Sequence, residues 1–210
     1  MECQTLVKVA HEGGQLTSDK NGLHLKDAEN CTLLIYMATN YDMNAENGFR
    51  GISAKERLKQ QTAQATTCSY DKLLKAHISD YQNLYQRQEL NIANTTNGNS
   101  LLPTPKRLAA YRETHADNGL EELIFRFGRY LMIQTSRPGS LPAGLQGIWN
   151  GMIAAPWGND YHSNINFQMV YWLPEVGNLS ECHLPMLDYL NAMRKPFKEN
   201  TQEYLKAIGE

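Results

Sequence analysis

Residues 162–166, with the sequence HSNIN, place three hydrogen-bonding side chains at alternate positions. Residues at positions i and i+2 of an extended strand point to the same face. If this segment is extended, His162, Asn164 and Asn166 line one face. Ile165 would then anchor the opposite face in the core. A row of neutral donors and acceptors suits a ligand with many hydroxyl groups. The spacing also fits a less specific interpretation, with Asn166 as a helix N-cap and Asn164 as a loop residue.

All three tryptophans of the chain, Trp149, Trp157 and Trp172, lie close to this run. An indole ring offers an apolar face that suits the C–H surface of a sugar, and its N–H donates a hydrogen bond. The same three residues would also suit the tryptophan-rich core of a helical domain. The sequence pattern favours neither a sugar-binding surface nor a core.

A glycosidase normally needs two carboxyl groups that flank the scissile bond. The carboxylates nearest to the two asparagines are Asp160 and Glu175. We expect Asp160 in an exposed loop, and Glu175, which follows a proline, as a capping or pairing residue. Glu181 closes the pattern of a helix-capping box over residues 178–181. None of these three carboxylates is predicted to be a general acid.

Composition and motifs exclude several classes of function. The 210 residues carry a formal net charge of −2, which gives no reason to expect binding to nucleic acid or to an anionic membrane. No stretch approaches the ~20 apolar residues of a membrane span. The four cysteines are widely spaced, as for free thiols, and the six histidines lack metal-ligand spacing. Phosphate-loop, dinucleotide and serine-hydrolase motifs are absent, so we predict no metal and no cofactor.

The first 40 residues are predicted to form β-strands. Residues 5–9 alternate between apolar and polar, and the glycines at 13–14 and the pair at 21–22 are turn signals. Residues 32–37 form a continuous apolar run, which favours a strand covered on both faces. Two or three strands do not form a stable sheet alone, so we predict the end of a larger sheet domain.

Helical patterns follow this β region. A capping box at residues 53–56 predicts one helix start, and residues 70–86 predict a second helix. Its expected buried face comprises Leu74, His77, Ile78, Tyr81, Leu84 and Tyr85, with His77 as a core histidine. Residues 89–92 could return as a strand. The polar residues 94–100 are the best candidate boundary or exposed loop, and a short basic helix is expected at 106–113.

The remainder is predicted to be helical around one long loop. Asn118 is expected to cap a helix with a core stripe of Leu120, Leu123, Ile124, Phe127, Tyr130 and Leu131. The loop at 140–163 is too apolar for disorder and favours an ordered, site-forming segment. A helix is expected from about 166 to 174, and two more from about 185 and about 197.

Residues 127–181 contain a series of short motifs: FGRYL (127–131), SRPG (136–139), LPA (141–143), LQGIWN (145–150), PW (156–157), NIN (164–166), YW (171–172) and NLSE (178–181). In their order and spacing these motifs resemble glycoside hydrolase family 95. Residues 77–87 and the strand before residue 38 resemble the family's linker and β-domain, so the resemblance covers nearly the whole chain.

The resemblance implies an α+β fold. Residues 1–95 would be the C-terminal part of a β-sandwich domain with linker helices, 96–117 a linker, and 118–210 the first helices of an incomplete (α/α)6 barrel. The family is mostly inverting α-L-fucosidases that act on terminal α-1,2-linked fucose, with some α-L-galactosidases. A fucosylated glycan is therefore the expected partner. Family members are generally exported, but any signal would lie upstream of Met1.

By the same resemblance, Asn164 and Asn166 match the two asparagines that bind the attacking water. His162, Trp157, Trp149 and Gln146 are expected to contact the substrate. A neutral carboxamide barely accepts a proton, so the asparagines can only orient a water that a carboxylate polarises.

The family's acid Glu and supporting Asp lie well downstream of the asparagine pair. We therefore expect an internal fragment that is inactive alone and poorly soluble, because its apolar helix faces lack cover. A non-catalytic carbohydrate-binding remnant, an α-L-galactosidase and a purely structural helical module remain alternatives.

Overall fold

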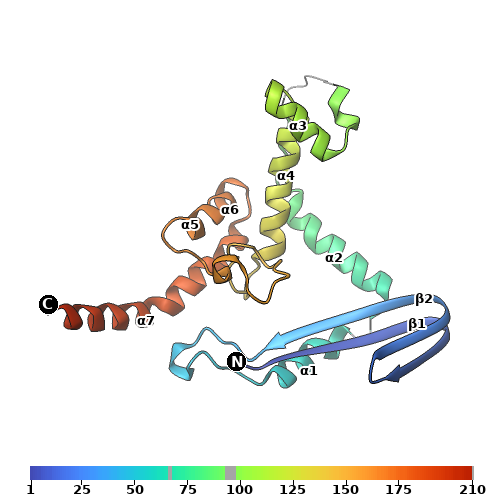
Figure 1. Cartoon of the computed structure of the whole chain (residues 1–210), viewed down its shortest axis with the longest axis horizontal. Coiled ribbons are helices and arrows are strands. Elements are labelled where there is room, and N and C mark those ends of the chain that lie inside the picture. Colours follow the sequence, from blue (N-terminus) through green and yellow to red (C-terminus); the bar gives the residue numbers. More distant parts are fainter. Residues whose placement is uncertain (66–67, 93–97, 210) are drawn as a thin grey trace. The chain divides into compact units, whose positions relative to one another are not determined.

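The computed structural model describes residues 1–65, 68–92 and 98–209, with a hairpin followed by helices (Figure 1). It divides into a hairpin unit, Met1–His77 with Ala192–Glu210, and a helical unit, Ile78–Asn191. No helix in these described ranges is long and apolar enough to cross a membrane. The elements are β1 (Cys3–Asp19), β2 (Gly22–Thr39), α1 (Ala54–Ala65), α2 (Tyr70–Tyr85), α3 (Thr104–Thr114), α4 (Asn118–Thr135), α5 (Asn166–Val170), α6 (Leu173–Val176) and α7 (Leu184–Ile208).

The hairpin unit is built on the antiparallel pair β1 and β2, which confirms the predicted β region. The carboxylate of Asp19 accepts hydrogen bonds from the backbone N–H groups of Asn21 and Gly22, at 2.7 and 3.1 Å, and so stabilises the tight turn. The register shifts by one residue at Glu12/Gly13. A Cβ on Gly14 would lie 2.4 Å from a backbone carbonyl oxygen, so this bulge requires glycine.

The expected burial of both faces of residues 32–37 is wrong for this structure. Leu33, Ile35 and Met37 are 56%, 59% and 70% exposed, whereas the alternate residues are half-buried. Helix α1 packs on β2 and covers that half-buried face with one stripe of residues, Ala54 and Leu58 among them. An apolar run shows that both faces of a strand could be buried, but it does not show that a second element packs on the other face.

Two helix starts follow local capping chemistry. The hydroxyl of Ser53 accepts a hydrogen bond from the N–H of Glu56 at 3.2 Å, which confirms the predicted start of α1. Helix α4 begins at Asn118, but the cap is Asp117, whose carboxylate accepts from the N–H of Leu120 at 3.0 Å. The predicted cap was therefore one residue too late, and an aspartate satisfies the free amide.

Asp117 also forms the best-buried ion pair of the described residues. The guanidinium of Arg107 in α3 donates to both of its oxygens, at 3.0 and 2.7 Å, and both side chains are about a tenth exposed or less. The hydrogen bond from Arg107, followed by that from Leu120, lowers the pKa of Asp117 below its ordinary value of 3.8. The carboxylate of Asp117 thus connects α3 to the start of α4.

We expect Asp117→Ala to lower the free energy of unfolding by about 3 kcal/mol, because it removes a cap and leaves Arg107 unpaired. The lowered pKa means that the wild-type contribution is complete above pH 3.8 and disappears as the pH falls through the folded-state value. Urea titrations at pH 7 and at several values below 4 would measure this. The difference in the free energy of unfolding between the wild type and the variant should shrink as the pH falls. A difference that stays constant with pH would contradict the prediction.

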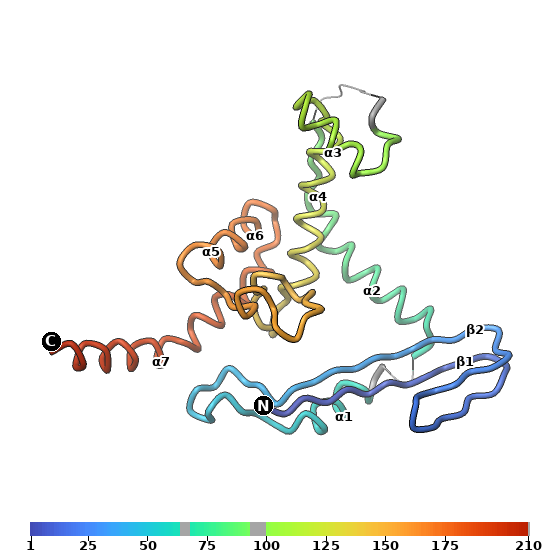
Figure 2. The backbone as a smooth tube through the Cα atoms, in the orientation of Figure 1, coloured from blue at the N-terminus to red at the C-terminus, as the bar shows by residue number. Residues whose placement is uncertain are grey.

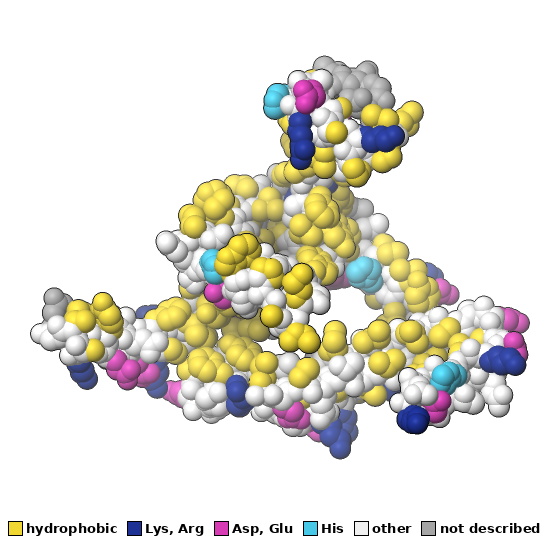
Figure 3. Space-filling view, viewed as in Figure 1, with side chains coloured by type: hydrophobic (Ala, Val, Ile, Leu, Met, Phe, Trp, Pro, Cys, Tyr) yellow, Lys and Arg dark blue, Asp and Glu magenta, His cyan; other side chains and the backbone are white. Residues whose placement is uncertain are grey.

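The core of the helical unit lies where α2, α4 and α5 meet the segment after α6. It contains the buried residues Leu84, Met132, Ile133, Phe167, Tyr171, Leu179, Cys182 and Met186. The predicted faces of α2 and α4 are therefore only partly correct. Leu84 and Leu120 are buried, but Leu74, His77 and Ile78 of α2 and Leu123, Ile124, Phe127 and Tyr130 of α4 are exposed. Hydrophobic side chains are visible over α4 in Figure 3.

Three further predictions about elements were wrong. Residues 89–92 form no strand in the structure, and Ile92 instead donates its N–H to Glu122. The expected helix 166–174 is divided into α5 and α6, because Pro174 lies in the first turn of α6 and has no N–H with which to continue α5. The two expected C-terminal helices are the single helix α7, which contains Pro196. Most of the predicted 94–100 loop lies outside the described residues.

Candidate active site

The predicted site residues lie on the long loop between α4 and α5 and on the first residue of α5 (Figure 2). Hydrogen bonds join residues 145–146 of this loop to residues 159–160. The N–H of Leu145 donates to the carbonyl of Asp160 at 3.3 Å, and the N–H of Gln146 donates to the side-chain oxygen of Asn159 at 3.2 Å. The loop is therefore ordered, as the sequence predicted, and it brings Gln146 next to the segment that contains Trp157.

A groove of about 480 Å³ lies along this loop. Gln146 and Trp149 line it together with residues of α4, Val170 of α5 and Leu173 of α6. The side-chain N–H of Gln146 donates to the carbonyl of Pro156 at 3.4 Å. Its carbonyl oxygen is buried and has no partner among the described residues. The groove is thus mainly apolar, with one unsatisfied acceptor that a ligand hydroxyl could use.

Trp157 is held in an unfavourable backbone conformation. It lies in the 3-10 helix η3 (Pro156–Asn159) with φ 51° and ψ 28°, and Gly158 and Asn159 also have positive φ. A bulky residue in the left-handed region is a strained exception that commonly marks functional segments. Its ring is 72% exposed. The loop therefore presents this indole to solvent instead of burying it.

His162 is oriented by Asp160. The carboxylate accepts a hydrogen bond from the backbone N–H of His162 at 3.0 Å and also contacts the ring nitrogen Nδ1. An ionised carboxylate only accepts, so Nδ1 carries the proton and Nε2 is left for another partner. The sequence pattern missed this pair, because Asp160 was considered only as a possible acid. The D-x-H spacing, with an aspartate two residues before the histidine, was the available signal.

Residues 162–166 do not have the extended conformation that would put the three polar side chains on one face. His162 has φ 46°, the next residues form a turn, and Asn166 is already the first residue of α5. Ile165 is 50% exposed and does not anchor the core. The N-cap alternative for Asn166 is also wrong, because the cap position is Ile165 and no side chain caps the helix.

The turn nevertheless leaves both asparagines accessible. Asn164 and Asn166 are exposed, and neither carboxamide has a hydrogen-bond partner among the residues that the structure describes. The carbonyl of His162 accepts from the N–H of Phe167 at 3.3 Å, which ties the histidine to the start of α5. Two free carboxamides and an oriented histidine therefore lie within five residues of each other in one turn.

Phe167 fixes this turn to the core. It is 2% exposed, and its ring meets those of Tyr161, Tyr171 and Tyr189 at centroid distances of 5.0, 5.5 and 5.9 Å. Edge and tilted ring contacts of this kind stabilise a defined orientation. Asn166 precedes Phe167 directly, so the aromatic cluster sets the direction in which the helix presents it.

The nearby carboxylates have the wrong properties for a general acid. Hydrogen bonds from Ser180 and then His183, at 2.7 and 2.8 Å, lower the pKa of Glu175. Its own backbone N–H and then Arg87 lower the pKa of Glu181. The predicted capping box at 178–181 is wrong, because the N-cap position of the 3-10 helix there is Leu179 and no side chain caps it; Glu181 instead forms an ion pair with Arg87 at 2.8 Å. A general acid needs a raised pKa, so neither carboxylate suits that role.

The exposure of the tryptophans decides between two of the interpretations. Trp149, Trp157 and Trp172 are 50%, 72% and 62% exposed. A tryptophan-rich core is therefore wrong for this structure, since the rings lie at the surface of the helical unit. Exposed indoles next to amide side chains are the arrangement in which a protein can stack on a sugar and bind its hydroxyl groups.

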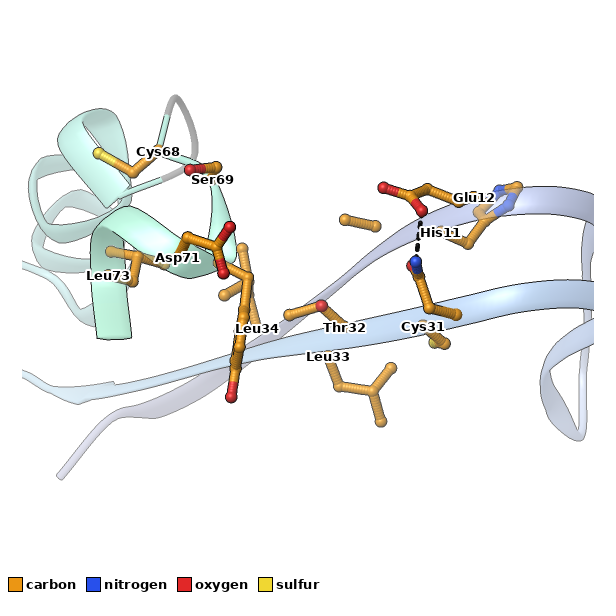
Figure 4. A pocket seen from close by; sticks show the side chains of 13 residues that line it. His11, Glu12, Cys31, Thr32, Leu33, Leu34, Cys68, Ser69, Asp71 and Leu73 are labelled. Atoms are coloured by element: carbon orange, nitrogen blue, oxygen red, sulfur yellow. Dashed lines mark hydrogen bonds between the residues drawn. The ribbon is translucent and has the colours of Figure 1, made fainter. Parts of the chain in front are cut away.

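A larger hollow of about 840 Å³ lies in the hairpin unit, between the strands and the start of α2 (Figure 4). Cys31 of β2 and Cys68 lie on opposite sides of it, and Glu12 is hydrogen-bonded to Asn30. None of the predicted site residues lines it. The described residues include no cluster of three or more metal-ligating side chains. Cys3, Cys31 and Cys182 are free thiols, as predicted.

Comparison with known proteins gives the class of this site and then its family. The family description "Glycosyl hydrolase family 95 catalytic domain" matches residues 69–210, which includes the whole loop and α5. The matched residues are thus similar to the catalytic domain of a sugar-hydrolysing enzyme. The chain belongs to glycosyl hydrolase family 95.

Curated relatives agree with this assignment. The chain is 35% identical to "Probable alpha-fucosidase A" of Aspergillus niger over 175 residues, or 83% of this chain and 22% of the relative. It is 33% identical to "Alpha-L-fucosidase 2" of Arabidopsis thaliana over 210 residues, or 97% and 24%. It is 31% identical to "Probable alpha-fucosidase A" of Aspergillus oryzae over 196 residues, or 90% and 27%. The chain spans about a quarter of the length of these relatives.

Proposed function

We propose that this chain forms the water-positioning half of an inverting α-L-fucosidase site that acts on terminal α-1,2-linked fucose. One observation carries the proposal: two exposed carboxamides of the same turn, those of Asn164 and Asn166, lack hydrogen-bond partners among the described residues. Each offers an acceptor and a donor, which is what holding a water molecule requires. The relatives named as fucosidases support the choice of sugar.

Sugar contacts in this proposal come from three side chains of the loop and from His162. Trp149 and Trp157 stack on the apolar face of the ring, and Gln146 uses its unsatisfied carbonyl oxygen to accept from a hydroxyl. His162, with Nδ1 held by Asp160, binds a second hydroxyl through Nε2. A fucosylated oligosaccharide is therefore the proposed partner.

The proposal assigns no general acid to this chain. The pKa values of Glu175 and Glu181 are lowered, and Asp160 is occupied by His162. An inverting glycosidase holds its water between two carboxyl groups about 6.5–9.5 Å apart. We propose that both groups belong to parts of the family's catalytic domain that this chain does not cover, and that 118–210 contributes the first helices of its (α/α)6 barrel. The 210 residues alone would then bind the sugar without hydrolysing it.

Calorimetric titration with fucose and 2′-fucosyllactose, with an assay for released fucose, tests the proposal. We expect binding without turnover, and a loss of affinity of about tenfold or more in Asn164→Ala/Asn166→Ala, since each substitution removes hydrogen bonds. Asn200→Ala changes an exposed asparagine of α7, outside the candidate site, and should leave binding unchanged. Release of fucose by the wild type would contradict the assignment of the acid. Equal binding by the double variant would contradict the role of the pair.

Binding without turnover is also what a non-catalytic carbohydrate-binding protein would show, and the three exposed tryptophans favour that alternative. The two functions differ in what a supplied acid would do. Fusion of this chain to the rest of a family 95 catalytic domain should give fucose release that depends on Asn164 and Asn166. Release that is independent of both asparagines would favour the binding protein. Titration with L-galactose separates the α-L-galactosidase alternative.

A further inference from the structure

A buried chain of hydrogen bonds crosses the helical unit beneath the candidate site. The backbone N–H of Ala143 donates to the hydroxyl of Tyr171 at 2.9 Å. The hydroxyls of Tyr171 and Ser136 are 2.8 Å apart, and that of Ser136 donates to the carbonyl of Cys182 at 2.7 Å. The four residues come from four separate segments, so these hydrogen bonds connect parts of the protein that are distant in sequence.

The direction of each hydrogen bond follows from counting protons. Ser136 has one hydroxyl proton, and the carbonyl of Cys182 takes it because a carbonyl can only accept. The Tyr171 hydroxyl must therefore donate to Ser136 and accept from the N–H of Ala143. Each donor in this series of hydrogen bonds has one acceptor, and hydrogen bonds aligned in this way strengthen one another.

All four residues joined by these hydrogen bonds are shielded from solvent. Ala143, Tyr171, Ser136 and Cys182 are 3%, 4%, 0% and 0% exposed. Burial raises the pKa of Tyr171, so its hydroxyl keeps the proton that it donates. The ring is also held by stacking on His183 and by edge contact with Phe167. The hydroxyl therefore has a fixed position and cannot exchange its partners for water.

Tyr171 lies between the two halves of the candidate site. Ala143 comes three residues before Gln146, and Tyr171 immediately follows α5, which begins at Asn166. Among the described residues, the bond from Ala143 is the one hydrogen bond that joins residues 143–149 to 166–176. Loss of this bond would remove the direct hydrogen bond between the first part of the loop and the end of α5, and would leave the bonds from Leu145 and Gln146 to Asp160 and Asn159 as the remaining polar connection to the turn.

We propose that Tyr171 is a positioning residue: its hydroxyl sets where the loop with Gln146 and Trp149 lies relative to the turn with Asn164 and Asn166. This inference rests on the proposed function, since it concerns how that site is assembled. Tyr171 does not touch the sugar in this account. It acts through Ala143 and determines whether the stacking surface and the water-binding carboxamides meet one ligand at the same time.

Tyr171→Phe removes the hydroxyl and keeps the ring. We expect the amide hydrogen of Ala143 to exchange with solvent at least about tenfold faster, since it loses its acceptor. The affinity for fucose should fall by about tenfold through misplacement of the loop. The amide of Leu120, capped by Asp117, should exchange at the wild-type rate. Tyr204→Phe, at a tyrosine that is 65% exposed, is the matched control and should change neither property.

A second variant covers the case in which Tyr171→Phe does not fold. Ser136→Ala keeps Tyr171 but removes its acceptor, and should raise both the exchange rate and the dissociation constant in the same direction. Unchanged exchange at Ala143, or faster exchange with unchanged sugar affinity, would overturn the proposal. If the wild type binds no fucoside, the proposed function fails, and the exchange rates of residues 143–149 alone decide whether Tyr171 holds the loop.

Discussion

Replacing Arg129 with methionine is expected to destabilise the helical unit by about 3–5 kcal/mol, because hydrogen bonds from charged donors contribute about 1.5–3 kcal/mol each. Arg129 is 1% exposed, and its guanidinium donates to the carbonyls of Leu84, Tyr85 and Gln88 at 3.1, 2.8 and 2.6 Å. These carbonyls belong to the C-terminal end of α2 and the residues just after it, where a helix has unsatisfied acceptors and a partial negative charge.

Burial lowers the pKa of Arg129, which shows that its charge is costly in this position. No carboxylate among the described residues pairs with it, so the carbonyls and the ring of Tyr85, 5.6 Å from the guanidinium carbon, offset that cost. Arg129→Lys should be intermediate, since an ammonium group cannot reproduce the fork of donors.

Urea denaturation followed by circular dichroism would measure both Arg129 variants. The matched control is Arg126→Met on the same helix. The Arg126 side chain is 42% exposed and lies 3.6 Å from both Glu89 and Glu122, and its loss should cost less than about 1 kcal/mol. Equal effects of the two substitutions would show that the buried contacts of Arg129 contribute nothing beyond a surface arginine.

Phe167→Ala is expected to cost about 3–5 kcal/mol, as removal of a fully buried aromatic ring usually does. The ring fills the space between Tyr161, Tyr171 and Tyr189, and its loss would also free the start of α5, including Asn166. Phe167→Leu should recover more than half of the stability, because it refills most of the volume. The exposed Phe127 provides the control, since Phe127→Ala removes a ring that is already 56% exposed.

Thermal or urea unfolding of the three phenylalanine variants would measure the order of their stabilities. Fucose titration of Phe167→Leu adds a functional test, since a retained fold with a loosened α5 should bind sugar more weakly than the wild type. A destabilisation of Phe167→Ala no larger than that of Phe127→Ala would refute the assignment of Phe167 to the core.

The sequence predicted elements well where the cause was local. The serine before α1 and the apolar periodicity of α2 act within one or two helical turns, and the start of α1 and both ends of α2 are close to those predicted. The buried face of α4 was predicted poorly, because burial depends on what packs against a helix. The sequence favoured Phe127 and Ile124 for the core, whereas Arg129 and Thr135 are buried there.

The order of the candidate-site loop could be predicted from its composition, but its shape could not. The exposure of the tryptophans agrees with a binding surface rather than a core. The extended conformation is absent because alternation of residue types does not determine φ at His162. The contacts that organise the site, from Asp160 to His162 and from Ala143 to Tyr171, join residues through space or through a turn. A one-dimensional pattern does not contain them.

The left-handed backbone at Trp157 places two properties of this protein in opposition. A non-glycine residue in that region costs about 1–3 kcal/mol, so the ring remains at the surface at the expense of folding stability. Laboratory evolution for heat resistance would favour glycine at this position, whereas the proposed stacking of the indole on a sugar would favour tryptophan. An engineer who stabilises this loop would therefore have to look elsewhere, for instance in the surrounding backbone, and leave the strained residue as it is.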